Sequence, residues 1–321
     1  MTTRWGILGT GGIASAFATD LRLTEDAQLA AVGSRTPAAA TSFAERHGFE
    51  RAYGSWVELA TDPEVDVVYV ATPHAFHEPA AMQCLRSGKA VLCEKPMTLD
   101  LASSALLVQE SRARRVFLME AMWMRCNPVI REIAELVGSG AIGRITAVHA
   151  DFGLQGPFEA THRLRDPELG GGALLDLGVY PIHFAHLLLG APTSVQAWAH
   201  LTPERVDETT GILFGYDTGS VAALTCSING ASRNAASITG ETGRIDLPVG
   251  FFAPREYTIT RGGTTETVSR PFEGQGYRFE ALEVQRCLAE GLLESPLVPA
   301  GVTLEVMTLM DTIRDEIGVV Y

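Results

Sequence analysis

A glycine-rich segment near the start of the chain limits what this sequence can fold into. Gly9-Thr10-Gly11-Gly12-Ile13-Ala14 follows the apolar run Trp5–Leu8 and precedes a helical pattern over 12–22. A G-x-G-x-x-G/A pattern between a strand and a helix is typical of the first turn of a dinucleotide-binding βαβ unit. Gly9 is expected to allow the tight turn, Gly11 to let the backbone approach a pyrophosphate, and Ala14 to keep helix and strand close. The N–H groups of Gly11, Gly12 and Ile13 are expected to point at the phosphates.

The rest of the first third repeats this strand–helix alternation. Apolar runs at 29–32, 65–71, 90–93 and 116–120 alternate with helical patterns at 37–47, 76–87 and 99–113. Such alternation predicts βαβ units and a parallel sheet with helices on both faces. We therefore expect residues 1–122 to form a doubly wound Rossmann domain that binds a dinucleotide.

The pattern changes after residue 122. A helical stretch at 127–138 is followed by alternating β-branched segments, and two helical stretches near 274–291 and 301–317 close the chain. The alternating segments lie at 144–152, 193–201, 208–216, 219–229, 232–240, 255–260 and 265–269. This pattern predicts a second, α+β domain over 123–321, built on a large, mostly antiparallel sheet with one open face. An open face needs a partner, so we expect a homodimer or homotetramer formed through this sheet.

Composition narrows the class of protein further. A length of 321 residues favours about two domains, and a net charge of −13 argues against a nucleic-acid or anionic-membrane partner. The five cysteines are scattered and lack C-x-x-C spacing, which indicates reduced thiols. There is no signal-peptide pattern at the N-terminus and no uncharged apolar stretch of membrane-spanning length. We expect a cytoplasmic protein.

The end of the second predicted strand bears on the choice of cofactor. An NAD-binding domain usually has an acidic residue there, which binds the ribose 2′-hydroxyl. This chain has Ser34 and Arg35 instead. Arg35 can form a bidentate pair with a 2′-phosphate, so the sequence favours NADP over NAD. The alternative is that Arg35 stacks on the adenine and that both cofactors bind.

Several further segments together resemble one enzyme family, the Gfo/Idh/MocA oxidoreductases. They are Ala71-Thr72-Pro73-His74 followed by His77, Cys93-Glu94-Lys95-Pro96, Gly170-Gly171-Gly172-Ala173 and Asp176-Leu177-Gly178-Val179-Tyr180-Pro181. The segments 120–125 and 276–281 are most similar to the dihydrodiol dehydrogenase and NADP-dependent xylose dehydrogenase branch. Many relatives have histidine at the position of Tyr180, which leaves the substrate open.

The resemblance implies an NAD(P)-dependent dehydrogenase that acts on a sugar or a cyclic diol. It assigns Lys95 to the pocket for cofactor and substrate, with Tyr180 and Asp176 opposite. Hydride transfer from an alcohol requires a base for the hydroxyl proton. A tyrosine titrates near pH 10 when unperturbed, and a nearby ammonium group lowers its pKa, since it favours the phenolate. We hypothesise that Tyr180 exchanges the proton while Lys95 lowers its pKa, and that Asp176 orients Lys95 or a second hydroxyl.

These arguments give two sets of predicted contacts. The cofactor contacts are Gly9, Gly11, Gly12, Ile13, Ser34, Arg35, Thr72, Pro73, His74, His77, Glu94, Lys95 and Pro96. The substrate contacts are Trp123, Arg125, Phe152, Arg163, Tyr180 and Phe279. His74, His77 and Glu78 lack the H-E-x-x-H spacing of a metal site. His183 and His186 form a helical i, i+3 pair with no nearby carboxylate partner evident in the sequence, so no metal is predicted.

Two other kinds of function remain open at this point. A non-catalytic sensor of the cofactor is one, although the presence of Lys95, Asp176 and Tyr180 disfavours it. A lyase or glycosidase that retains NAD(H) and uses it transiently is the other. Tightly held cofactor without net turnover would point to such an enzyme.

Overall fold

The protein, described by a computed structural model over residues 2–321, divides into two compact units. The first unit contains Met1–Cys126 and Glu273–Leu304, and the second contains Asn127–Phe272 and Glu305–Tyr321. Helix α10 (Ala300–Ile317) therefore begins in the first unit and ends in the second. We predicted two contiguous domains, 1–122 and 123–321, and this division stays a prediction. In the structure, residues 273–304 group with the first unit.

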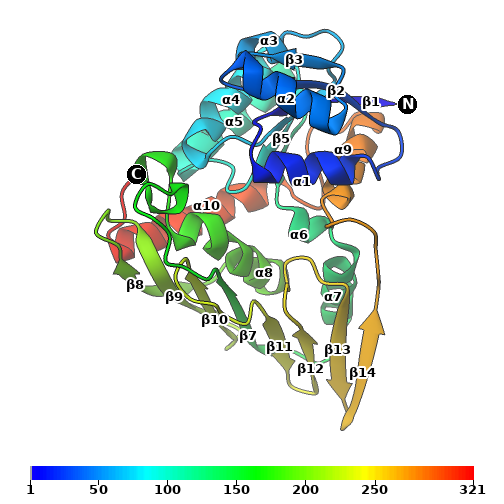
Figure 1. Ribbon diagram of the computed structural model, residues 1–321. Helices are drawn as coiled ribbons and strands as arrows, with labels where there is room; N and C mark the ends of the chain where they lie inside the picture. The colour runs from blue at the N-terminus through cyan, green and yellow to red at the C-terminus, as the bar shows by residue number, and fades with distance from the viewer. Residues whose placement is uncertain (1) are drawn as a thin grey trace. The chain divides into compact units, whose positions relative to one another are not determined.

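The first unit is built on a six-stranded sheet with the order β3-β2-β1-β4-β5-β6. Figure 1 labels β1, β2, β3 and β5 of this sheet. All five strand pairs are parallel, which confirms the predicted Rossmann sheet. The strand order changes direction between β1 and β4, where dinucleotides bind in this fold. The strands are β1 (Thr3–Leu8), β2 (Ala27–Gly33), β3 (Arg51–Tyr53), β4 (Val67–Val70), β5 (Ala90–Glu94) and β6 (Leu118–Ala121).

Helices alternate with these strands, and local sequence explains where several begin and end. Helix α2 has Thr36 as its N-cap, proline at its first position, and Gly48 in the left-handed conformation at its end. Asp100 is the N-cap of α5, and its side chain accepts a hydrogen bond from the backbone N–H of Ser103. The helices of this unit are α1 (Gly12–Leu21), α2 (Pro37–His47), α3 (Trp56–Ala60), α4 (His77–Arg86), α5 (Leu101–Arg114), α6 (Trp123–Cys126) and α9 (Arg278–Ala289).

A buried carboxylate joins α9 to the Rossmann sheet's first helix. Asp20 on α1 is fully buried and accepts hydrogen bonds from the backbone N–H groups of Gln275, Gly276 and Tyr277. Gly274 makes this possible, because a Cβ there would lie 2.6 Å from the Asp20 Oδ1 atom. This contact explains why 273–304 groups with the first unit, although it lies far along the chain.

The second unit is built on an eight-stranded sheet with the order β14-β13-β12-β11-β7-β10-β9-β8. Only β7 and β10 pair in parallel, so the predicted large, mostly antiparallel sheet is confirmed. The strands are β7 (Ile145–Gly153), β8 (Ser194–Leu201), β9 (Asp207–Gly215), β10 (Val221–Ser227), β11 (Ala236–Gly240), β12 (Gly243–Leu247), β13 (Glu256–Arg261) and β14 (Thr264–Ser269).

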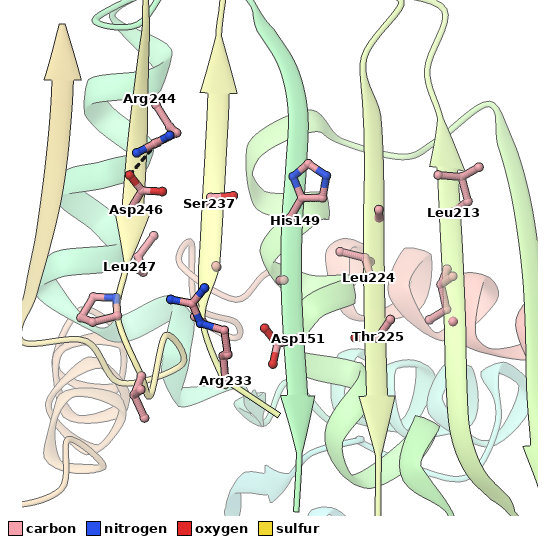
Figure 2. A pocket seen from close by; sticks show the side chains of 18 of the residues that line it. His149, Asp151, Leu213, Leu224, Thr225, Arg233, Ser237, Arg244, Asp246 and Leu247 are labelled. Carbon is pink, nitrogen blue, oxygen red and sulfur yellow. Dashed lines mark hydrogen bonds and ion pairs between the residues drawn. The ribbon is translucent and has the colours of Figure 1, made fainter. Parts of the chain in front are cut away.

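Helices α7 (Pro128–Gly138) and α8 (Val179–Leu189) pack together, and α8 contacts β7 and β10. Within this unit, the strands carry apolar side chains on the face covered by α8 and mostly polar side chains on the other. Val148 and Phe152 of β7 are buried, whereas His149 is exposed and Asp151 half-buried. Figure 2 shows this second face, which is hollowed and carries His149, Asp151, Arg233 and Asp246.

One helical run in the second unit, Pro167–Leu189, is long and apolar enough to span a membrane, although it contains the charged residues Glu168 and Asp176. Its mean hydropathy is 1.3, but 83% of its most apolar part is buried inside the protein. The run includes α8 and the turn before it, which lie against the sheet. Its apolar character is accounted for by this core packing.

Candidate active site

The glycine turn after β1 has the form that a dinucleotide requires. Gly9 has a φ of +116°, and a Cβ there would lie 2.4 Å from the carbonyl oxygen of Ala71. A Cβ added at Gly11 or Gly12, in contrast, would have nothing within 4 Å, so the space beside these two residues is open. Helix α1 begins at Gly12 with no side-chain cap, which leaves its first N–H groups available. These features fit a pyrophosphate, as predicted for this loop.

The predicted segments 72–77 and 94–96 lie after neighbouring strands. Strand β4 pairs with both β1 and β5, so the loops after all three strands meet at one edge of the sheet. Thr72 and Pro73 are half-buried there, and His74 is buried at the start of a 3₁₀ turn. Lys95 is half-buried, and its peptide bond with Pro96 is cis. The structure thus brings together the cofactor residues that the first unit was predicted to supply.

His77 links two of these loops through backbone atoms. Its Nδ1 lies 2.9 Å from the carbonyl oxygen of Pro96 and its Nε2 lies 2.9 Å from that of Thr72. The ring is 1% exposed, and burial together with the nearby His74 lowers its pKa to about 3. A neutral ring donates only one hydrogen bond, so it is paired with one carbonyl and only in contact with the other. These contacts make His77 a spacer between the two loops, and its contact with the cofactor stays a prediction.

Glu94 has a similar supporting position for Lys95. It is 4% exposed, its Oε1 accepts a short hydrogen bond from the Tyr69 hydroxyl, and its Oε2 accepts one from the backbone N–H of Lys95 at 3.1 Å. The carboxylate therefore fixes the backbone from which the Lys95 side chain extends. Burial and the Glu94 charge raise the pKa of Tyr69 well above its usual value, so Tyr69 is a hydrogen-bond donor here.

Ser34 and Arg35 follow β2 at the same edge of the sheet. Ser34 is buried, and its hydroxyl lies 3.3 Å from that of Thr10 in the glycine turn. Arg35 is exposed. Among residues 2–321, its guanidinium has no hydrogen bond or ion pair. This arrangement fits the predicted pairing of Arg35 with a phosphate.

In the second unit, Asp176 and Tyr180 lie on one continuous helical segment. Asp176 is within a π-helical turn, Leu174–Gly178, and Tyr180 follows at the start of α8. Single π turns inside α-helices occur frequently at functional sites. Asp176 is 7% exposed and accepts two hydrogen bonds of 3.2 Å from Arg163, so the structure brings these two predicted residues together.

Aromatic rings surround Tyr180 on the covered face of the large sheet. The rings of Phe152 and Phe252 are stacked with centroids 4.4 Å apart, and they lie 5.3 Å and 5.5 Å from the ring of Tyr180. Phe152 was predicted and Phe252 was not. Phe252 lies in the loop between β12 and β13, outside any periodic pattern, so the sequence carried no signal for it beyond its aromatic character.

The remaining predicted substrate residues belong to the first unit. Trp123 is 5% exposed, with its ring 4.3 Å from that of Tyr277, and Phe279 has the Arg278 guanidinium 5.3 Å from its ring centre. Arg125 is buried and donates from Nε to the carbonyl of Leu297. Within the described part of the chain, its Nη1 has no hydrogen-bond partner.

The chain matches known proteins over its full length. Residues 3–122 match the family "Oxidoreductase family, NAD-binding Rossmann fold", and residues 130–246 match "GFO/IDH/MocA C-terminal domain". The trans-1,2-dihydrobenzene-1,2-diol dehydrogenase of Xenopus laevis is 37% identical over 331 residues, covering 100% of both proteins.

Solved structures are also similar to this chain over nearly its whole length. A 3-ketoreductase from Actinomadura kijaniata in complex with NADP and TDP-benzene has a TM-score of 0.88 and 30% identity, covering 99% of this chain and 98% of that one. An aldose-aldose oxidoreductase from Caulobacter crescentus has a TM-score of 0.88, covering 98% of this chain and 97% of that one. At 24% identity, this second likeness concerns the fold alone.

Proposed function

The chain belongs to the Gfo/Idh/MocA oxidoreductase family, and on that premise we propose that it transfers hydride between NADP(H) and a small cyclic diol or sugar. It is an NAD(P)-binding oxidoreductase by family. The observation that carries the substrate class is the 37% full-length identity to a dihydrodiol dehydrogenase. The rings of Phe152 and Phe252 beside Tyr180 support it, because stacked aromatic rings suit the flat face of a cyclic substrate.

The proposed chemistry requires one proton acceptor and one positive charge at the substrate oxygen. When bound, the nicotinamide supplies the hydride acceptor. As the substrate C–H bond breaks and its electron pair leaves with the hydride, the hydroxyl proton would pass to Tyr180, which accepts it as the phenolate that Lys95 favours. Lys95 would stabilise the negative charge on the reacting oxygens, and Asp176, held by Arg163, would bind a second hydroxyl. These roles are proposals, and each has its own test.

Reduction of NADP+ in the presence of candidate substrates tests the function directly. The panel contains trans-cyclohexane-1,2-diol, xylose, glucose and myo-inositol, each with NADP+ and with NAD+, and nicotinamide absorbance is followed. We expect turnover with at least one diol or sugar and faster turnover with NADP+. Tightly retained cofactor with no net turnover on any substrate would contradict the proposal and favour the retained-cofactor enzyme.

The Tyr180→Phe variant tests the proton-transfer role. Removing only the hydroxyl should abolish turnover and leave NADP binding close to that of the wild type, because Tyr180 lies outside the glycine turn. Phe252→Leu is a suitable comparison, since it alters the same ring cluster without removing an acid. Wild-type turnover in Tyr180→Phe would refute the assignment.

Lys95 can be followed individually because the chain has only two lysines, Lys89 and Lys95. Reductive methylation with ¹³C-labelled formaldehyde would label the amines of both lysines together with the N-terminal amine. The Nζ of Lys89 donates to the backbone carbonyls of Asp62 and Val65, away from the glycine turn, so its signal serves as a reference. We expect NADP+ to shift the Lys95 signal and not the Lys89 signal. Equal or absent shifts would remove Lys95 from the cofactor site.

We further propose that the open face of the large sheet is a homodimer interface. Cross-strand pairing places Gln196, Leu213, Ala223, His149, Ser237, Asp246 and Thr258 in one row across that face. Trp198 and Val249, which line the hollow there, are 71% and 78% exposed. Large exposed apolar side chains on a flat sheet are typical of a contact surface. The opposite charges of Arg244 and Asp246 on the same face suit an isologous contact (Figure 2).

Light scattering after size-exclusion chromatography measures the oligomeric state. The wild type should elute as a dimer or a tetramer, and Leu213→Arg, which puts a charge at an exposed position of the row on β9, should shift it towards the monomer. Val57→Arg is a control, because Val57 is 54% exposed on α3 in the other unit. A monomeric wild type would contradict the interface.

We also propose that the protein is cytoplasmic. All five cysteines are free and buried, which suits a reducing compartment. A tagged copy expressed in its own cells should fractionate with cytoplasmic markers. Recovery from a secreted fraction would contradict this.

A further inference from the structure

We propose that Asp207 is a positioning residue that holds the start of the helical segment carrying Asp176 and Tyr180. Asp207 is outside the set of residues that the hydride-transfer chemistry uses. The inference rests on the proposed function in one respect, because its effect on turnover requires that Asp176 and Tyr180 act on substrate. The contacts that carry it lie within the second unit.

Asp207 is the first residue of β9 and is fully buried. Its Oδ2 accepts a hydrogen bond of 2.7 Å from the backbone N–H of Leu174 and one of 2.6 Å from the Thr210 hydroxyl. Leu174 is the first residue of the π turn that contains Asp176 and leads into α8. The carboxylate therefore caps the N-terminus of this helical segment from a different element, which is where a negative charge is most favourable.

The glycine run before the helix is needed for this contact. Gly172 has a φ of +107°, and a Cβ there would lie 2.2 Å from the Asp207 Oδ1 atom. Its N–H donates to the carbonyl of Leu164, and the N–H of Gly171 donates to that of Asp166. The run is thus held between Asp207 on one side and the 163–166 turn on the other. That turn carries Arg163, the ion-pair partner of Asp176, so the Asp207 contact also affects where Arg163 sits.

Burying the charge of Asp207 costs free energy. Helix capping alone therefore does not explain why this position has an acidic residue. Within residues 2–321, Oδ1 has no hydrogen-bond partner. Burial raises the pKa of Asp207 to about 7, although the hydrogen bonds from Thr210 and Leu174 oppose the shift. The titratable groups that face it are Tyr321 and Cys226, and neither is a cation. A serine or asparagine would cap a helix without this cost. The charged residue gives stronger hydrogen bonds and a better-defined helix start.

The Asp207→Asn variant tests the proposal, since it keeps the size of the side chain and removes its charge. Hydrogen exchange followed by mass spectrometry should show the amides of 174–180 exchanging about tenfold faster, because a charge-assisted bond becomes a neutral one. The amides of α7 serve as the internal reference and should not change. Turnover should fall about tenfold in kcat with little change in KM for NADP.

The pH dependence of kcat separates positioning from a general loss of stability. The kcat of the wild type should fall as the pH drops below about 7, where Asp207 takes up a proton. This acid limb of the pH profile should be missing in Asp207→Asn. Thr210→Val removes a hydrogen bond that lowers the pKa of Asp207, so it should move the limb to higher pH, whereas Thr210→Ser should leave it in place. A limb that stays in place in Thr210→Val and Asp207→Asn overturns the positioning role.

The exchange measurement also separates this inference from the proposed function, because it needs no turnover. Faster exchange at 174–180 in Asp207→Asn, with a wild type inactive on every substrate, would support the anchoring and contradict the proposed function. Unchanged exchange with an active wild type would overturn the anchoring alone.

Discussion

Asp176 and Arg163 form a bidentate ion pair, in which two guanidinium nitrogens each lie 3.2 Å from a carboxylate oxygen. Asp176 is buried on the helical segment that carries Tyr180, while the Arg163 side chain is 48% exposed. The two side chains come from different elements, so their pairing fixes the orientation of the Asp176 carboxylate. The fork of an arginine matches both oxygens, which a lysine cannot do.

Replacing Arg163 should therefore affect turnover more than stability. We expect kcat/KM to fall about tenfold in Arg163→Lys and more in Arg163→Ala, because Asp176 is left without its planar partner. The free energy of unfolding should change by less than about 1 kcal/mol, since Arg163 is half exposed and the pair is screened by solvent. Steady-state kinetics and urea unfolding measure the two quantities. Wild-type kcat/KM in Arg163→Ala would show that the pair does not orient Asp176 for catalysis.

The two glycines of the first turn should respond differently to alanine. Gly9→Ala should destabilise the protein without cofactor by roughly 1–3 kcal/mol, because its positive φ and its contact with the Ala71 carbonyl leave no room for a Cβ. Gly11→Ala should change that stability by less than about 0.5 kcal/mol, yet weaken NADP binding at least about tenfold, since the new Cβ enters the space beside the helix N-terminus. Urea unfolding and fluorescence titration with NADP give both values.

The opposite pattern for these glycines would mean that the open space beside Gly11 is not where the pyrophosphate binds. Gly138→Ala provides a matched control, because Gly138 lies on α7 with nothing within 4 Å of its Cβ position. It should leave NADP binding unchanged and should not destabilise the protein, because alanine at an open helical position stabilises by up to about 1 kcal/mol.

Arg35 is expected to set the preference for NADP over NAD. In Arg35→Ala, kcat/KM for NADP+ should fall about tenfold to a hundredfold, because a charge-assisted pair with the 2′-phosphate is lost. The value for NAD+ should stay near that of the wild type, since NAD has no phosphate there. Parallel kinetics with both cofactors provide the comparison. An equal loss with both would favour the alternative in which Arg35 stacks on the adenine.

Glu280 should make stability depend on pH in a direction opposite to that of most acids. It is fully buried on α9, and neither carboxyl oxygen has a hydrogen-bond partner among residues 2–321. Burial, with the charges of Glu94 and Asp20, raises its pKa well above the usual value. A raised folded pKa contributes stability that is complete below the unfolded pKa, about 4.3, and that is lost as the pH rises towards the folded pKa. Glu280→Gln should therefore be more stable than the wild type at pH 8 and not at pH 4.

Glu283 on the same helix is the matched control for this measurement. Although burial raises its pKa, hydrogen bonds from Arg286 and Ser295 lower it on balance. Its contribution to stability is present above the unfolded pKa and is lost as the pH falls. Glu283→Gln should consequently lower stability at pH 8, the reverse of Glu280→Gln. Urea unfolding of both variants at the two pH values would reveal the difference, and the same sign for both would contradict it.

Periodic segments of the sequence predicted most of the helices and strands. The helix predicted at 37–47 is α2 with the same bounds, because a cap, a proline and a final glycine mark it in the sequence. Strands β3 and β12 and helices α3, α6 and α8 were not predicted. The first four are only a few residues long, and α8 is apolar on all sides, so it has no amphipathic pattern to detect.

Candidate site residues were predictable where a local motif carries them. The glycine turn and the loops at 72–77 and 94–96 are contiguous segments, and the parallel sheet brings their ends to one edge. The backbone contacts of His77 and Glu94 could not be predicted, because they depend on which carbonyl or amide each side chain reaches after folding. Phe252 was missed for the same reason, since only the folded chain places its ring against Phe152 and Tyr180.

The sequence by itself determined the class of the protein: a dinucleotide-binding turn, a parallel sheet followed by an open antiparallel one, and the family to which these belong. Local spacing is enough for that, because turns, caps and strand alternation act over a few residues. Only the tertiary structure decided that Asp20 holds the segment before α9, that Asp207 caps the helix of Asp176 and Tyr180, and that Glu280 is buried without a partner among residues 2–321. Each of these depends on groups far apart in the chain, and burial and hydrogen bonding between them exist only once the chain has folded.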